Sequence, residues 1–150
     1  MAHAQQQVLD AIRAALLAGG TVAGSRVFLD RDDTPLQPGE LPALLINEGD
    51  DGESSETDDI DGSEFRTLSV VIDCILSPAS DSAAEARAFG LAVEKIVSPD
   101  AALRLLARDG PRITSSRLIQ RGDGDRFLSC RRQTWLVGYC VNPATPDVIF

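Results

Sequence analysis

Several residue types on which common functions depend are scarce in this chain of 150 residues. It has one histidine, one lysine, one methionine and three cysteines. The histidine, His3, lies at the N-terminus, so a Cys–His or Ser–His pair would lack a well-placed base. Cys74, Cys130 and Cys140 are odd in number, widely spaced and without a C-x-x-C pair, which excludes a disulfide framework and a finger-type zinc site. We expect structural thiols on strands and no enzymatic activity.

Long apolar runs and nucleotide-binding motifs are also missing. No segment approaches the roughly 20 apolar residues that a membrane-spanning helix needs. The N-terminal segment lacks a cationic start, and Asp10 and Arg13 interrupt its apolar stretch, so it does not resemble a signal peptide. Neither G-x-x-x-x-G-K-[ST] nor G-x-G-x-x-G occurs. We therefore expect no cofactor, no membrane partner and a protein made in the cytoplasm.

Charge is abundant but unevenly placed. The formal net charge is -9, from 14 basic and 23 acidic residues. Residues 48–64 contain nine of the acids and no base, and the other 14 acids equal the 14 bases. Residues 104–132 contain eight arginines and three aspartates, a charge of +5. The sequence thus describes a neutral body with one acidic and one basic region.

The acidic segment has few residues that could be buried, and we expect a mobile loop over 48–64. Neither Gly52 nor Gly62, placed at position six of an EF-hand loop, gives the required ligand pattern, and no helices flank the segment. A metal site is not expected, although screening of the clustered carboxylates by divalent cations stays open.

Apolar periodicity predicts the secondary structure. Helices are expected over 4–17, from Asp81 or Ser82 to about 97, and again after Ser98-Pro99, with Ser98 as the N-cap. Strands are expected over 26–30, 41–48, 65–76, 113–120 and 126–141, the last two joined by a turn at Gly122-Asp123-Gly124. On strand 65–76, alternate residues from Leu68 to Leu76 share an apolar face.

This order predicts an α+β fold. We expect a mainly antiparallel sheet of about four to five strands with two to three helices packed on one face. Residues 1–141 should form one domain, and residues 142–150 a poorly packed C-terminal arm.

The arginine-rich region permits two interpretations. Nucleic-acid binding is one, but aromatic residues are few there, and Arg131 and Arg132 point to opposite faces of a strand. Ion pairs with the chain's own acids, or with a neighbouring subunit, are the favoured alternative. We do not expect sequence-specific nucleic-acid binding.

The order of segments resembles a family, the tail terminator proteins of long-tailed bacteriophages, also called minor tail protein U-like proteins. The matching segments are "VLDAIRAALLAG", "RVFLDRDDTPLQPGELPALLINEG", "FRTLSVVIDCILSP", "AAEARAFGLAVEKIV" with "SPDAAL", and the closing "QTWLVGYCV". They cover about residues 4–141, and no single motif among them is specific.

The resemblance implies a virion structural protein of the tail. Its copies form a ring, expected to be hexameric, that ends polymerisation of the tail tube and then joins the head. The implied partners are further copies of the chain, the tail tube protein and a head completion or connector protein. Another head–tail connector or tail-completion subunit, or a small ligand-binding or regulatory α+β domain, are the alternatives.

A ring of head-to-tail subunits needs two different complementary surfaces. Our interface expectation on the basic side comprises Arg112, Arg117, Arg121, Arg126, Arg131 and Arg132. Their expected partners are the acids of residues 48–64, or Asp30, Asp32 and Asp33. The acids expected to face the lumen or the tail tube are Asp50, Asp51, Glu53, Glu56, Asp58, Asp59 and Asp61.

Overall fold

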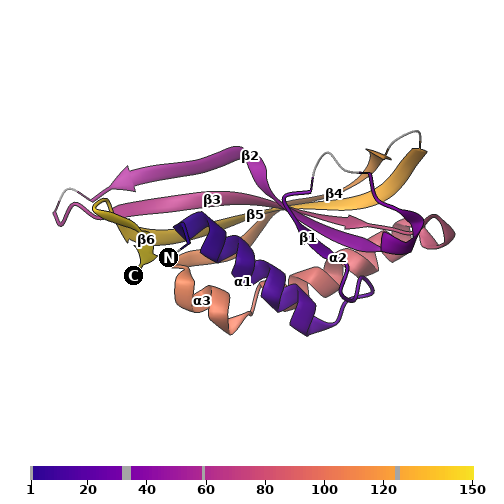
Figure 1. Cartoon of the computed structure of the whole chain (residues 1–150), viewed down its shortest axis with the longest axis horizontal. Coiled ribbons are helices and arrows are strands. Elements are labelled where there is room, and N and C mark those ends of the chain that lie inside the picture. Colours follow the sequence, from indigo (N-terminus) through magenta and orange to yellow (C-terminus); the bar gives the residue numbers. More distant parts are fainter. Residues whose placement is uncertain (1, 32–34, 59, 124–125) are drawn as a thin grey trace.

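One elongated sheet with three helices on one of its faces forms the protein (Figure 1). The computed structural model describes residues 2–31, 35–58, 60–123 and 126–150, without the side chains of Asp123 and Arg126. The helices are α1 (Ala4–Gly19), α2 (Ala83–Val97) and α3 (Ala101–Leu106). The strands are β1 (Val27–Leu29), β2 (Ala43–Thr57), β3 (Glu64–Ile75), β4 (Asp109–Asp123), β5 (Arg126–Asn142) and β6 (Thr145–Ile149). The α+β prediction is confirmed.

The strands follow the order β1-β2-β3-β5-β4, and β6 pairs with β5. All neighbours are antiparallel except β1 and β2, which are parallel. Because β2, β3, β4 and β5 are long, the sheet extends beyond the helices, and the paired ends of β2 with β3 and of β4 with β5 lie at opposite ends of the molecule (Figure 1). Of the predicted turn Gly122-Asp123-Gly124, the first two residues belong to β4, and Gly124 lies outside the described residues.

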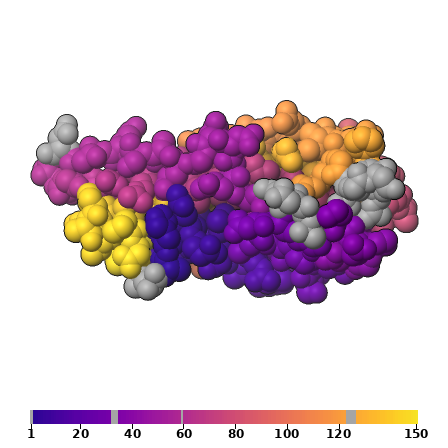
Figure 2. Space-filling model, turned by 45° about the horizontal axis from the view of Figure 1, so that its top comes forward, coloured from indigo at the N-terminus to yellow at the C-terminus, as the bar shows by residue number. Residues whose placement is uncertain are grey.

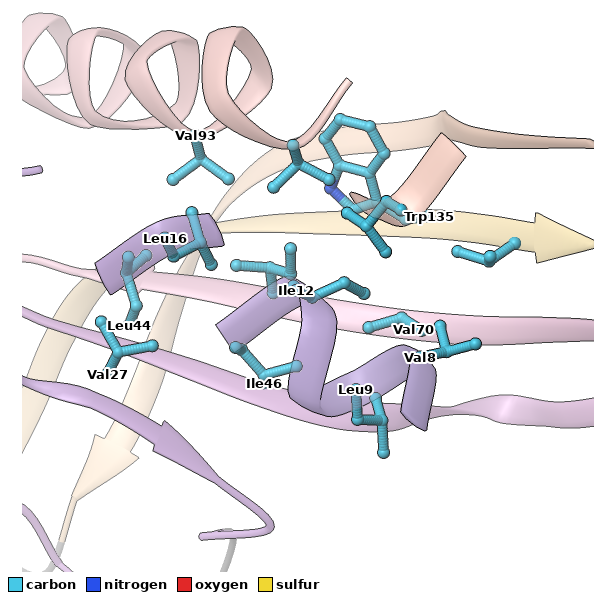
Figure 3. Close-up of a cluster of buried hydrophobic side chains, with 14 of the residues drawn as sticks. Val8, Leu9, Ile12, Leu16, Val27, Leu44, Ile46, Val70, Val93 and Trp135 are labelled. Carbon is cyan, nitrogen blue, oxygen red and sulfur yellow. The ribbon is translucent and has the colours of Figure 1, made fainter. Parts of the chain in front are cut away.

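The main core lies between the helices and the sheet. Side chains of α1, including Val8, Ile12 and Leu16, pack toward Ile46 of β2 and Val70 of β3 (Figure 3). The face of β3 predicted from Leu68 to Leu76 is buried in this cluster, as expected. A period of two in the sequence therefore identified the face that the helices cover.

A second, smaller core lies on the opposite face of the sheet. It contains Leu36, Leu41, Ala43, Leu45, Ile75, Leu128 and Cys130. The segment that leads into β2 covers these residues, and Arg31 and Glu40 pair across it. The hydrogen bond from Arg31, together with the Gln37 backbone N–H, lowers the pKa of Glu40 to about 2. The described part of the segment before β2 thus covers this face of the sheet through Leu36 and Leu41.

The expectation of a mobile acidic loop is wrong for most of residues 48–64. Strand β2 continues to Thr57 and pairs with β3 from Glu53–Leu68 to Thr57–Glu64. A bulge between Glu48 and Glu53 interrupts the ladder, and Gly52 there has a left-handed φ of 58°. The segment folds because backbone hydrogen bonds to β3 do not require apolar side chains. We call residues 48–64 the acidic ribbon.

Two other expectations need correction. The C-terminal residues are not a loose arm, because β6 pairs with β5 through Val141–Ile149 and Asn142–Thr145. The helix after Ser98-Pro99 starts later than predicted, because Asp100 is its N-cap and accepts a hydrogen bond from the Leu103 backbone N–H. Ser98 instead ends α2.

Candidate interface surfaces

The paired part of the acidic ribbon, from Glu53 onward, and the hairpin of β4 and β5 occupy different ends of the sheet, whereas the ribbon bulge lies beside Arg117 and Arg132. The ribbon forms one end of the long axis, and the hairpin of β4 and β5 forms the other (Figures 1 and 2). On the helix-free face, strand register places Arg117 opposite Arg132, Arg112 opposite Leu136 and Arg121 opposite Leu128. We call the helix-free surface of β4 and β5 the arginine face. It lies on the far side of the sheet from α2.

Most acids of the ribbon are exposed. Asp50 and Asp51 lie on the bulge, and Glu56 lies on the paired part of β2. At the turn, the Asp58 carboxylate accepts hydrogen bonds from the Ile60 and Asp61 backbone N–H groups, which orders the turn locally. Hydrogen bonding to Ser63 lowers the pKa of Asp61. Asp59 lies outside the described residues.

Two described ribbon acids are only partly exposed: Glu64, which pairs with Arg66, and Glu53. Glu53 makes its contacts with other elements. Its Oε2 accepts a hydrogen bond of 2.5 Å from Gln5 Nε2 on α1, and its Oε1 accepts one from the hydroxyl of the buried Tyr139. The expectation gave Glu53 the same surface role as its neighbours. The structure places it on the helix side, where it holds the ribbon to α1 and β5.

A buried carboxylate organises two of the predicted arginines. The Asp73 side chain on β3 is only 2% exposed. Arg132 donates to both of its oxygens, at 2.8 and 2.9 Å, and Arg121 donates at 3.1 Å. This pairing raises the pKa of Arg132, because the hydrogen bonds to Asp73 favour the charged guanidinium.

The cluster makes Arg121 and Arg132 parts of the arginine face that are held in place from within the chain. Asp73 was not among the residues selected from the sequence. Its signal there is a single acid in the apolar run "SVVIDCIL", but only strand register shows which arginines surround it.

The other predicted interface residues differ in their surroundings. Arg117 is exposed and has no hydrogen bond or ion pair within the described chain. Arg112 is exposed and lies 3.6 Å from Asp109. Arg131 lies on the helix side, where its Nε donates to Ser116 Oγ. Arg131 and Arg132 thus point to opposite faces, as predicted.

Asp30 is exposed with a left-handed φ of 53°, and its backbone N–H donates to the Ile46 carbonyl. Asp32 and Asp33, and the side chain of Arg126, lie outside the described residues. The structure therefore brings Arg117, Arg121 and Arg132 together on one face, but it does not bring Asp30 or Arg131 to them.

The surface has one polar and one apolar depression of note. A polar one of about 300 Å³ lies between the ribbon bulge and the arginine face, lined by Asp50, Asp51, Arg117 and Arg132 among others. An apolar groove of about 390 Å³ lies beside α2, lined by residues such as Val22, Pro42, Leu76 and Phe89.

Burial raises the thiol pKa of Cys74 and of Cys130, which suits structural rather than nucleophilic roles. Within the residues that the structure describes, no three His, Cys, Asp or Glu side chains lie close enough to hold a metal ion. In the same part of the chain, no helix has the length and apolar character required to cross a membrane.

Comparison of the chain with protein-family models found no matching family, and comparison with curated proteins found no match.

Proposed function

We propose that this protein is a structural subunit of bacteriophage tail assembly. Its copies form a ring, hexameric by resemblance to the tail terminator proteins, on the end of the tail tube. The ring stops addition of tube subunits and then presents a surface to a head completion or connector protein. The order of helices and strands supports this proposal, as does the segment-by-segment resemblance in the sequence.

One structural observation carries the proposal: the acids near the ribbon turn and the arginines of the β4–β5 hairpin lie toward different ends of the same sheet. The turn end of the ribbon and the β4–β5 hairpin lie toward different ends of the molecule, so each is available to a different neighbour (Figure 2). The bulge acids Asp50 and Asp51 instead share a depression with Arg117 and Arg132 of the same chain. Head-to-tail contact between two unlike surfaces is the geometry from which closed rings are built.

The ribbon gives such a ring a second property. Six copies would bring six acidic ribbons to one assembly. If the ribbons line the channel, their like charge keeps passing DNA from adhering to the wall. The exposed positions of Asp50, Asp51 and Glu56 support this role, whereas Glu53 is occupied by contacts within the subunit.

Solution mass tests the proposal directly. We expect a species near 96 kDa, six times the 16.0 kDa chain, as protein concentration and Mg²⁺ are raised. Addition of that species to polymerising tail tube protein should stop growth and leave short capped tubes, as seen by electron microscopy. A chain that stays at 16.0 kDa under every condition, or tubes that grow unchanged, would overturn the proposal.

Charge neutralisation in the ribbon tests the observation that carries the proposal. For the triple variant Glu56→Gln, Asp58→Asn and Asp61→Asn, we expect self-association about tenfold weaker, since exposed ion pairs contribute about 0.5 kcal/mol each. Added salt should weaken the wild type in the same direction. Sedimentation across a concentration series measures both effects.

A matched control removes three exposed acids elsewhere. Asp10→Asn, Asp81→Asn and Glu85→Gln change the net charge equally but lie outside the ribbon. We expect the association of this control to equal that of the wild type. Equal weakening in both variants would show that net charge, rather than the ribbon, controls assembly.

A different class of function has one observation in its favour. The apolar groove beside α2 has the size of small-molecule sites, which begin near 300 Å³. A ligand-binding domain would be a monomer or dimer with a small apolar molecule in this groove, so the mass measurement separates the two functions. Another head–tail connector subunit would also assemble, but it would bind portal or head completion proteins rather than tube ends.

A further inference from the structure

Two stretches of strand have an open edge. β1 pairs with β2 only from Leu44 to Ile46, so, among the residues that the structure describes, the ribbon part of β2, Glu53–Thr57, pairs with β3 alone. β4 is the last strand at the other border, and β5 is its only partner strand in the described chain. Open edges present unpaired backbone N–H and C=O groups and serve as templates for another strand.

The direction of the backbone groups in β5 follows from three hydrogen bonds. The Leu76 N–H donates to the Ser129 carbonyl, so the backbone N–H and C=O groups of odd-numbered β5 residues point toward β3. The Arg108 N–H donates to the Gly138 carbonyl, and the Phe150 N–H donates to the Cys140 carbonyl. Even-numbered residues of β5 therefore turn toward β4 and β6, as the antiparallel alternation requires.

This alternation decides which groups of β4 face outward. Arg117 and Ile119 lie opposite the even-numbered Arg132 and Cys130, so their backbone groups bond to β5. Leu118 and Gln120 lie between these positions, and their N–H and C=O groups therefore point away from the sheet.

The ribbon follows the same rule. The Asp58 N–H donates to the Ser63 carbonyl, which turns odd-numbered residues of β3 toward β2. Ser54 and Glu56 lie opposite odd-numbered residues and bond inward. Ser55 and Thr57 consequently direct their backbone groups to the open border.

Other parts of these borders are protected. β1 covers the beginning of β2, and β6 covers β5 beyond the start of β4. The first part of β4 contains Pro111, which has no N–H to donate, and its register shifts between Asp109 and Arg112 and again before Ser115. Such devices discourage strand pairing, whereas 116–122 and 53–57 keep regular register and contain no proline.

The two open stretches carry opposite charge. Residues 53–58 include Glu53, Glu56 and Asp58 and no base, and residues 116–122 include Arg117 and Arg121 and no acid. Because Glu53 and Arg121 make contacts within the subunit, the complementary charges at the borders are those of Glu56 and Asp58 and that of Arg117. They lie on opposite borders of the sheet and toward its opposite ends (Figure 1). A single chain cannot bring them together, but two copies can.

We propose that the sheet continues from one copy into the next, with Ser116–Gly122 of β4 paired to Glu53–Thr57 of β2 in a second copy. Since β2, β3, β5 and β4 alternate in direction, a second copy added in the same orientation presents a β2 that is antiparallel to β4. This inference rests on the proposed function and names the contact that would build its ring. Main-chain hydrogen bonds supply affinity, and the opposite charges set the pairing.

Proline at an outward-facing position tests the contact, because it removes a donor that the isolated subunit does not use. We expect Ser55→Pro to block one border and Leu118→Pro the other. Each variant alone should stay at 16.0 kDa, and an equimolar mixture should form a dimer of twice that mass and stop there. Assembly stops at a dimer only if the contact joins the β4 border of one copy to the β2 border of another.

Matched controls keep the backbone donor. Ser55→Thr and Leu118→Thr should assemble like the wild type, and far-UV circular dichroism should show the same strand content in all four variants. Hydrogen exchange of the wild type gives a readout without substitution: on assembly, the Leu118 and Gln120 amides should slow at least tenfold, while the inward Arg117 amide should change little.

The outcomes separate this inference from the function on which it rests. If the wild type forms a ring and both proline variants form it too, or if the Leu118 amide is unchanged on assembly, edge pairing is wrong and the ring stands. If the wild type stays at 16.0 kDa under every condition, both the edge-pairing inference and the proposed ring function are overturned.

Discussion

Asp73→Ala should lower the free energy of unfolding by about 3 kcal/mol, because it leaves two arginines without their shared carboxylate. Arg121 is 13% exposed and would keep a largely buried charge, whereas Arg132 is 34% exposed and can be rehydrated in part. We therefore place the effect at the lower end of the range for broken buried pairs. Urea unfolding followed by circular dichroism measures it.

An exposed pair of the same chemistry provides the control. Arg112 and Asp109 lie 3.6 Å apart with more than half of each side chain exposed. Asp109→Ala should cost less than about 1 kcal/mol. If the two variants lose similar stability, Asp73 does not organise the arginine face.

Trp135→Ala should lower the free energy of unfolding by about 4 kcal/mol. The indole is 1% exposed and lies in the main core between α2 and the sheet (Figure 3), so its removal leaves a cavity. The indole Nε1 also donates to Gln133 Oε1, and Gln133 Nε2 donates to the Gly90 carbonyl of α2. The variant therefore leaves a buried acceptor without its donor as well.

Phe127 on the same strand is the matched control, because it is also aromatic but 75% exposed. Phe127→Ala should change stability by less than about 0.5 kcal/mol. Both variants are compared by urea unfolding with far-UV circular dichroism, which does not depend on the tryptophan signal. A loss below about 1 kcal/mol for Trp135→Ala would contradict the role assigned to this contact.

Local patterns in the sequence were sufficient for the elements that bury a face. α1 and α2 follow from apolar residues at helical spacing, and Ser82 caps α2 as its spacing to Glu85 indicates. The alternation in β3 predicted the apolar face that packs against the helices. These predictions succeed because burial against a second layer imposes a period on the residues themselves.

The ribbon and β6 were not predictable in the same way. Glu53–Thr57 and Thr145–Ile149 have no apolar alternation, and each becomes a strand because a longer neighbour offers backbone groups to pair with. Composition identified the acidic segment correctly and its conformation incorrectly. Backbone hydrogen bonds do not depend on side-chain type, so the side-chain pattern does not predict them.

The predictions about the candidate interface divide in the same way, into those that local sequence supports and those that depend on strand register. The sequence alone predicts a neutral body with one acidic and one basic segment, because charge follows from composition. It also predicts that Arg131 and Arg132 point in opposite directions, because neighbouring residues of a strand alternate between its faces. Strand register in the structure brings Arg121 and Arg132 to Asp73 and leaves Arg117 without a partner in the described chain. It also directs the backbone groups of Ser55 and Leu118 toward the open borders. Those relations join positions far apart in the chain, and pairing between strands sets them after the local elements exist.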